Sequence, residues 1–344
     1  MKHLKIEIIL LKIKKLWNDM AYNEKILKDD SLRVFLIGSG GPFNNEVRVA
    51  PCIAVIAGGE FFLVDVGPGT YRIVDIMRLP IPYLSKIFLT HFHSDHIGDL
   101  GEANMMSWAN GRTKAIEIYS PEGVEKVVNG FIMAYEHDTG YRIAHHGKNI
   151  ILPEAGTPIS KTIKFSDLNE RKLCFETNGL KVYAFQVDHS PVKPAVGYRI
   201  EYKGNVVVIT GDTKKTDNLA EHCKDADILF SEAISYDLLN NMIENLKRSN
   251  LTRPIKILKD IQDYHMELVV AARVAKEVGV KKLVYVHITL PLTNKTTEEL
   301  YLKGVSDIFE GEIILGRDRM KFRLKPKFWK SPSLLTLKIK KNSL

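Results

Sequence analysis

The sequence predicts an α/β fold in which two β-sheets pack face to face under outer helices, a four-layer αββα sandwich. Three observations predict it. Short β-rich runs occur in both halves of the chain, helical stretches separate the later runs, and metal-binding side chains follow several of them. The 344 residues, 45% apolar and 26% charged, have a globular composition and can bury a sizeable core.

Three strands are predicted near the start, each followed by a turn signal. They cover Arg33–Ile37, Cys52–Ile56 and Phe61–Val66, and we expect them to form an antiparallel meander. The first turn, Gly38–Pro42, resembles a dinucleotide-binding loop only superficially, because the helix pattern that such a loop needs is missing and a proline interrupts it. A tight turn is favoured.

The later strands alternate with helices. Helical spacing is found from about Gly98 to Ala109 and over Met266–Val278. The predicted strands are Lys86–Thr90, Ile116–Tyr119, Lys181–Val187, Val196–Glu201, Asn205–Thr210, Ile228–Ser231 and Leu283–Val286. We expect one domain over residues 32–324, preceded by a helical N-terminal extension (1–31) and followed by a basic tail (325–344).

The formal net charge of +8 is concentrated at the two ends of the chain. Residues 321–344 contain eight Lys and Arg and no acid, and the first twenty residues contribute +3, which leaves −3 for residues 21–320. A mildly acidic body weakens the case for a surface that follows phosphates across the whole fold. The basic tail is typical of a solvated segment, although it could also contact nucleic acid.

Cysteine usage and hydropathy indicate a cytoplasmic protein. Cys52, Cys174 and Cys223 are widely spaced and form no CxxC pair, which fits a reducing compartment. No apolar run approaches the roughly 18 to 20 residues that span a bilayer, and Ile8–Leu11 is too short for a signal-peptide core. A basic amphipathic helix that makes peripheral membrane contact is the alternative to a plain helical extension.

Three histidines and an aspartate fall within six residues, directly after a predicted strand: His91, His93, Asp95 and His96. His91 and His93 are two apart and can face the same way on extended chain, whereas the other two follow the turn. This arrangement suits two adjacent metal ions with nitrogen and oxygen ligands. A solvated polar loop is the weaker interpretation, because three histidines rarely cluster by accident.

Three further metal-capable side chains come just after predicted strands: His189, Asp212 and His287. Ligand sites in α/β folds gather at the carboxyl ends of strands. We therefore expect the four segments to converge on one edge of the sandwich.

These segments resemble the motifs of the metallo-β-lactamase superfamily. The matching stretches are Thr90–His96, Asp188–Pro191, Thr210–Thr213 and Val286–His287, and the likeness extends from about Leu32 to Phe322. The resemblance implies two groups of ligands: His91, His93 and His189 for the first metal, Asp95, His96 and His287 for the second, with Asp212 bridging both.

Two neighbouring metals favour hydrolysis. They can share a bridging hydroxide that attacks at neutral pH, while both polarise the oxygens of an ester. The ligand set contains no cysteine and carries His93, not Glu, between His91 and Asp95, which favours two Zn²⁺ per chain over iron. Asp95 is counted among the catalytic residues as well as among the ligands.

Within the superfamily, Gly197–Ile200, Ser231–Ala233 and His265 are similar to ribonuclease Z and its arylsulfatase-like relatives. The resemblance implies that Glu232 orients His265, which protonates the leaving oxygen. Histidine suits that role because its ordinary pKa lies near neutrality. The alternative is a surface histidine at the start of the helix Met266–Val278.

The stretch Tyr135–Gly147 resembles the arylsulfatase-like relatives more than ribonuclease Z. His145 and His146 are adjacent, so on extended chain they would point in opposite directions and at most one could face the site. A place in the substrate pocket and a structural role are equally supported. Trp108 is expected in the core.

The first hypothesis is a hydrolase of a small anionic phosphodiester or sulfate ester, active as a homodimer. The runner-up is a tRNA 3′-processing endoribonuclease, ribonuclease Z, with RNA as its partner. Ribonuclease Z usually grips tRNA with an arm inserted between the residues matching His189 and Asp212, and here only 22 residues separate them. A mononuclear-iron persulfide-oxidising enzyme and a binding module without catalysis are further alternatives.

Overall fold

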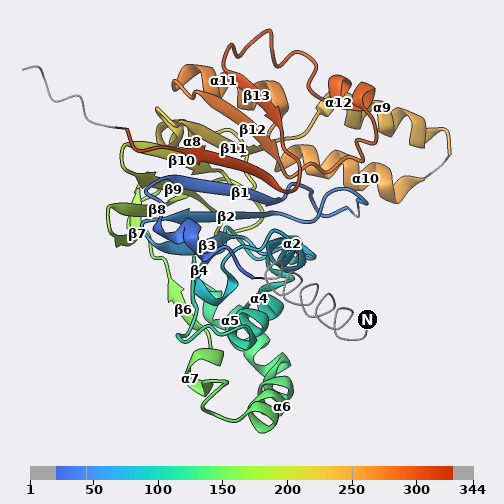
Figure 1. Cartoon of the computed structure of the whole chain (residues 1–344). Coiled ribbons are helices and arrows are strands. Elements are labelled where there is room, and N and C mark those ends of the chain that lie inside the picture. Colours follow the sequence, from blue (N-terminus) through green and yellow to red (C-terminus); the bar gives the residue numbers. More distant parts are fainter. Residues whose placement is uncertain (1–20, 44, 250, 328–344) are drawn as a thin grey trace, which may run out of the picture.

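Two seven-stranded sheets form the centre of the computed structural model, which describes residues 21–43, 45–249 and 251–327 (Figure 1). The first sheet has the order β14-β1-β2-β3-β4-β5-β6. Its strands are β1 (Leu32–Gly38), β2 (Cys52–Ala57), β3 (Glu60–Val64), β4 (Leu84–Phe88), β5 (Glu117–Ser120), β6 (Ile159–Thr162) and β14 (Met320–Leu324).

The second sheet has the order β13-β12-β11-β10-β9-β8-β7. Its strands are β7 (Lys172–Thr177), β8 (Leu180–Gln186), β9 (Val196–Tyr202), β10 (Asn205–Ile209), β11 (Ile228–Glu232), β12 (Lys282–Val286) and β13 (Glu312–Leu315). In each sheet an antiparallel half is joined to a parallel half. The antiparallel pairing of β1, β2 and β3 confirms the predicted meander.

Apolar side chains on both faces of each sheet explain the four layers. Buried residues such as Val55, Tyr198 and Phe230 fill the space between the two sheets. The other face of the first sheet packs against α2 (Thr70–Ile76), α4 (Leu100–Ala109) and α5 (Val124–Ala134). The second sheet is covered by α8 (Asp217–Cys223), α9 (Tyr236–Lys247), α10 (Thr252–Asp260), α11 (Leu268–Glu277) and α12 (Lys295–Tyr301). The predicted αββα sandwich is therefore confirmed.

The remaining helical elements are short or project from the sandwich. They are α3 (Ser94–Ile97), α6 (Glu136–His146), α7 (Pro153–Gly156) and the 3₁₀ turns η1 (Glu24–Lys28), η2 (Ile81–Tyr83) and η3 (Ile261–Asp263). The predicted helices over 98–109 and 266–278 correspond to α4 and α11. In the part of the chain that the structure describes, no helix is long and apolar enough to cross a membrane.

The sequence prediction missed the strands at the sheet edges. β6 and β14 alternate between partly buried and exposed residues, so they lack the apolar run by which the central strands were recognised. β14 pairs with β1 and places Leu324 opposite Leu32, the two ends proposed for the domain. The proposed helix of residues 1–20 and the tail beyond Lys327 lie outside the described residues.

The stretch Tyr135–Gly147 is helical, so the expectation stated for His145 and His146 on extended chain does not apply to it. This stretch forms α6, which stands out with α7 from the first sheet (Figure 1). His137 and Tyr141 stack four residues apart, a contact that a helix makes and extended chain does not. His145 and His146 both lie exposed in the last turn of α6.

Candidate metal centre

The carboxyl ends of four strands bring the predicted ligands together. His91 and His93 follow β4, His189 follows β8, Asp212 follows β10, and His287 follows β12. The loops that carry the ligands thus come together at one edge of the sandwich. The positions of these residues directly after predicted strands led us to expect this.

Two glycines allow the loops at this edge to approach one another. A Cβ on Gly67 would come within 1.9 Å of the backbone oxygen of Asp95. Gly211 has φ +61, and a Cβ there would lie 2.9 Å from the Cβ of Thr90. Only glycine permits both this approach and this conformation, so the ligand loops of the two sheets can pack directly.

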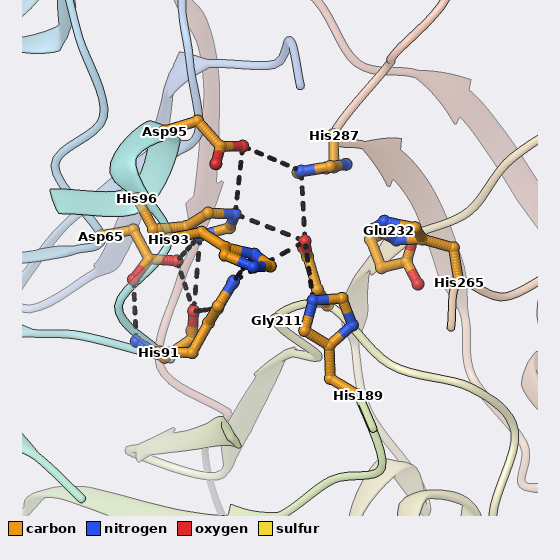
Figure 2. A network of polar contacts seen from close by, with 12 residues as sticks. Asp65, His91, His93, Asp95, His96, His189, Gly211, Glu232, His265 and His287 are labelled. Atoms are coloured by element: carbon orange, nitrogen blue, oxygen red, sulfur yellow. Dashed lines mark hydrogen bonds and ion pairs between the residues drawn. The ribbon is translucent and has the colours of Figure 1, made fainter. Parts of the chain in front are cut away.

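The first group of donors contains His91, His93, His189 and Asp212, whose ligand atoms all lie within 4.8 Å of one another. Figure 2 shows the three histidine rings of this group facing a common centre. The Oδ2 atom of Asp212 is 3.9 Å from Nε2 of His91 and 3.8 Å from Nε2 of His189. His93 is the one exposed member, so this side of the centre is open to solvent.

The second group contains Asp95, His96 and His287. Oδ2 of Asp95 lies 3.5 Å from Nε2 of His96 and 3.3 Å from Nε2 of His287. Oδ2 of Asp212 is 3.4 Å and 3.2 Å from the same two nitrogens. Asp212 therefore stands between the two groups, and the grouping agrees with the one that the resemblance implies.

The donor atoms fit metal ions. Nε2 of His96, Nε2 of His189 and Oδ1 of Asp212 are buried without a hydrogen-bond partner. Buried polar atoms are almost always paired, so unpaired lone pairs at one place favour a cation. Imidazole nitrogens with carboxylate oxygens are a donor set that zinc accepts.

Polar contacts behind the ligands orient their rings. Asp65 accepts hydrogen bonds from Thr90 N at 2.8 Å and Thr90 Oγ1 at 2.9 Å, and its Oδ2 is 2.8 Å from Nδ1 of His96. Nδ1 of His189 lies 3.0 Å from the backbone oxygen of Tyr264. Both contacts hold Nδ1, which directs Nε2 of each ring toward the centre.

Asp65 was not among the residues predicted for the site. It follows a buried strand directly and stands before a glycine turn, the same signal that identified the ligands. A carboxylate at a strand end next to a histidine cluster could therefore have been included.

Burial and charge shift the pKa values of the ligands in opposite directions. Burial lowers the pKa of His91 well below its usual value, and the neighbouring His96 adds to this. Burial alone would lower the pKa of His96, but Asp212 and Asp65 outweigh it and raise that pKa well above the usual value. Burial would raise the pKa of Asp212, whereas His287 and His96 hold it well below its ordinary range.

Glu232 and His265 lie beside the donor groups (Figure 2). Nδ1 of His265 is 3.1 Å from Oε2 of Glu232, and Oε1 of Glu232 accepts hydrogen bonds from the backbone N–H groups of Thr213 and Met266. His265 also forms a group of close donor atoms with Asp212 and His287. Burial alone would lower the pKa of His265, but Glu232 raises it.

His265 is only 6% exposed, so the alternative of a surface histidine is wrong. Trp108 is buried, as predicted, and donates to the backbone oxygen of Leu152. The glycine turn packs against the second group: Gly41 N donates to the backbone oxygen of Ile288. No helix follows this turn among its described residues, which agrees with a tight turn and not with a dinucleotide loop.

The fold and the donor set together define a metallo-hydrolase. The family model described as "Beta-lactamase superfamily domain" matches residues 61–288. Ribonuclease Z of Mycobacterium bovis is 32% identical over 301 residues, which cover 86% of this chain and 99% of the relative. Ribonuclease Z of Mycolicibacterium paratuberculosis is 33% identical over 292 residues, 83% of this chain and 96% of the relative.

Solved structures show the same fold. The short form of human tRNase Z has a TM-score of 0.60 at 21% identity and covers 84% of this chain and 98% of its own. A metallo-β-lactamase fold protein from Bacillus subtilis has a TM-score of 0.60 at 20% identity, covering 86% and 100%. The chain belongs to the ribonuclease Z family of the metallo-β-lactamase superfamily. It is an enzyme, a metal-dependent hydrolase that acts on ester bonds.

Proposed function

We propose that this enzyme is an endoribonuclease that removes the 3′ trailer of precursor tRNA. One observation carries the proposal: the buried pair of Glu232 and His265 stands beside a seven-residue donor cluster. The relatives named ribonuclease Z support it, because one of them aligns with 86% of this chain and 99% of its own length. The pair of Glu232 and His265 provides a proton donor, and cations held by the cluster would stabilise the negative charge on a phosphodiester.

Seven residues would hold two divalent cations, for which we propose zinc: His91, His93, Asp95, His96, His189, Asp212 and His287. When bound, such ions supply Lewis-acid polarisation of the phosphodiester and lower the pKa of water. The absence of cysteine from the donor groups among the described residues supports zinc with nitrogen and oxygen ligands.

The chain's own groups position and move protons. Glu232 fixes Nδ1 of His265, so that Nε2 can deliver a proton to the leaving oxygen of the substrate. Asp95 is partly exposed, so its carboxylate can accept a proton from the attacking water. Buried Asp65 keeps the ring of His96 in one orientation throughout.

The names of the relatives favour one class of substrate. The curated proteins described above are named ribonuclease Z, which favours a phosphodiester over the sulfate ester that the arylsulfatase-like resemblance suggested. Two complete donor groups also weaken the mononuclear-iron oxidoreductase and the binding module, because neither needs the second group.

A small-phosphodiester hydrolase is the second candidate, and one observation favours it. β9 and β10 occupy the 22 residues between His189 and Asp212, so no arm for tRNA is inserted there. With either candidate function we propose a cytoplasmic location and a homodimer. The free state of Cys52, Cys174 and Cys223 supports a reducing compartment.

The test combines metal analysis with three substrates. We expect about two zinc ions per chain and cleavage of a precursor tRNA at the 3′ end of its acceptor stem. Hydrolysis of bis(p-nitrophenyl) phosphate without tRNA cleavage would favour the second candidate. Turnover of p-nitrophenyl sulfate in preference to both, or bound iron without hydrolysis, would contradict the proposal.

A further inference from the structure

A groove lies beside the segment Asp188–Ser190, which carries the donor His189. This side groove has a volume of about 770 Å³, within the range of roughly 300 to 1,000 Å³ that is usual for ligand pockets. Its lining includes Glu122, Lys164, Phe165, Leu168, Ser190 and Lys193. Asp188 and Ser190, the two neighbours of the donor His189 in the chain, both line the groove.

The side groove lies at the same sheet edge as the ligands. β5 and β6 run parallel to β4, and their carboxyl ends lead to Glu122 and to Lys164. β8 leads past His189 to Ser190. The groove and the ligands therefore share one edge of the sandwich, as a chain-like substrate that reaches both would require.

The charge of the side groove suits phosphate. Lys164 and Lys193 are exposed, and neither forms an ion pair with another of the described residues. The carboxylate of Asp188 is already occupied, because it accepts from the Ser190 hydroxyl at 2.6 Å and lies 3.3 Å from Lys214 Nζ. The lining holds two lysines and two acids, but Asp188 is engaged by Lys214 from outside the lining. Lys164 and Lys193 therefore face Glu122 as the one lining acid without an ion-pair partner among the described residues.

An aromatic side chain completes the side groove. Phe165 is half-buried because it packs against the core between the sheets, which fixes its ring, and its remaining surface lines the groove. Leu168 extends this apolar surface and is 67% exposed. An aromatic platform next to unpaired lysines is the combination by which proteins bind single-stranded nucleic acid.

We propose that the side groove binds single-stranded nucleotides on one side of the scissile phosphate. Lys164 and Lys193 contact backbone phosphates, and a base stacks on Phe165. The proposal rests on the proposed function in taking RNA as the substrate. It adds a gripping surface to a chain that has no arm between His189 and Asp212, and it explains why unpaired cations stand at this edge of an acidic body.

The first test replaces both lysines with glutamine in the full-length, metal-loaded enzyme. Binding of a fluorescent 2′-O-methyl hexanucleotide is followed by anisotropy at several salt concentrations. We expect the Lys164→Gln/Lys193→Gln variant to bind about tenfold more weakly, with a salt slope smaller by about 0.7 for each phosphate that a lysine no longer neutralises. Hydrolysis of bis(p-nitrophenyl) phosphate, which does not extend into the groove, should be unchanged.

The matched control is Lys224→Gln/Lys303→Gln, which removes two exposed lysines that do not line the side groove. It should bind the hexanucleotide as the wild type does. Equal weakening in this control would show a non-specific charge effect and overturn the proposal.

The second test is Phe165→Leu, which keeps apolar packing against the core but removes the ring. We expect about tenfold weaker oligonucleotide binding with an unchanged salt slope and an unchanged Tm. Unchanged binding in both groove variants would overturn the proposal, as would an equal loss of small-ester turnover. If wild type binds the hexanucleotide through these residues but leaves precursor tRNA uncut, only the proposed function fails. If the wild type and the groove variants cut the precursor tRNA equally well, the proposed role of the groove is overturned and the proposed function stands.

Discussion

The two sheets contribute to the metal centre in different ways. The first sheet supplies four of the seven donors from one segment of six residues after β4, whereas the second supplies one donor after each of β8, β10 and β12. A compact segment keeps its donors together by local geometry. Scattered donors meet only when the strands before them are correctly paired, so the second half of the centre depends on the whole fold.

The groups that contact Nδ1 of the ligand histidines also differ between the two sheets. On the first sheet, the carboxylate of Asp65 holds Nδ1 of His96, while on the second sheet a backbone oxygen, that of Tyr264, contacts Nδ1 of His189. A carboxylate adds negative charge to the ligand shell, and a backbone oxygen adds only orientation. Substitutions can therefore test the donors of the first sheet and those of the second sheet independently.

The largest effect is expected from Asp212→Ala, because this residue faces both donor groups. Turnover should fall at least about a thousandfold, and metal content measured by plasma mass spectrometry should fall for both sites. His93→Ala also removes turnover, but as the exposed member of one group it should lower metal content less. If the Asp212→Ala variant still binds two equivalents of metal per chain, Asp212 is not a ligand shared by the two groups.

A smaller loss is expected from His265→Ala. We expect kcat to fall about 10²- to 10⁴-fold while the metal content stays at the wild-type level, because this residue would act on the leaving oxygen. Glu232→Gln should lower kcat less, since the side chain remains to contact Nδ1. Complete metal loss in His265→Ala would make the residue a ligand, as its proximity to Asp212 and His287 would then explain.

Asp65→Asn probes the first sheet alone. It should weaken metal binding about 10- to 100-fold, as is usual when the partner of a ligating histidine is changed. Tyr264→Phe is the counterpart on the second sheet and should leave metal affinity unchanged, because the contact to His189 comes from the backbone. Competition titrations with a chromophoric chelator measure both, and equal effects would remove the proposed asymmetry.

The smallest effect is expected from the double variant His145→Ala/His146→Ala. Both side chains are exposed at the end of α6, away from any strand end. Metal content and small-ester turnover should match the wild type, and the free energy of unfolding should change by less than about 0.5 kcal/mol. Loss of metal would show that histidines outside the strand ends also belong to the centre.

These two pairs of histidines show how far sequence patterns lead. His91 and His93 were placed correctly because they follow an apolar strand, and a strand end fixes where the next residues point. The expectation for His145 and His146 was stated for extended chain, and it does not apply because this stretch is helical, as the spacing of His137 and Tyr141 indicates. The edge strands β6 and β14 were missed because their exposed faces leave no continuous apolar run.

The sequence by itself determined the types of the donors and their order along the chain, since side-chain chemistry and strand ends are local properties. It also determined the layered fold, because alternation and helical spacing recur in both halves. Only the tertiary structure decided how closely Asp212 approaches each group, that Asp65 holds His96, and that a groove opens beside His189. These relations join residues far apart in sequence, and they arise from the parallel pairing of β10, β11 and β12 and from close packing of the two sheets.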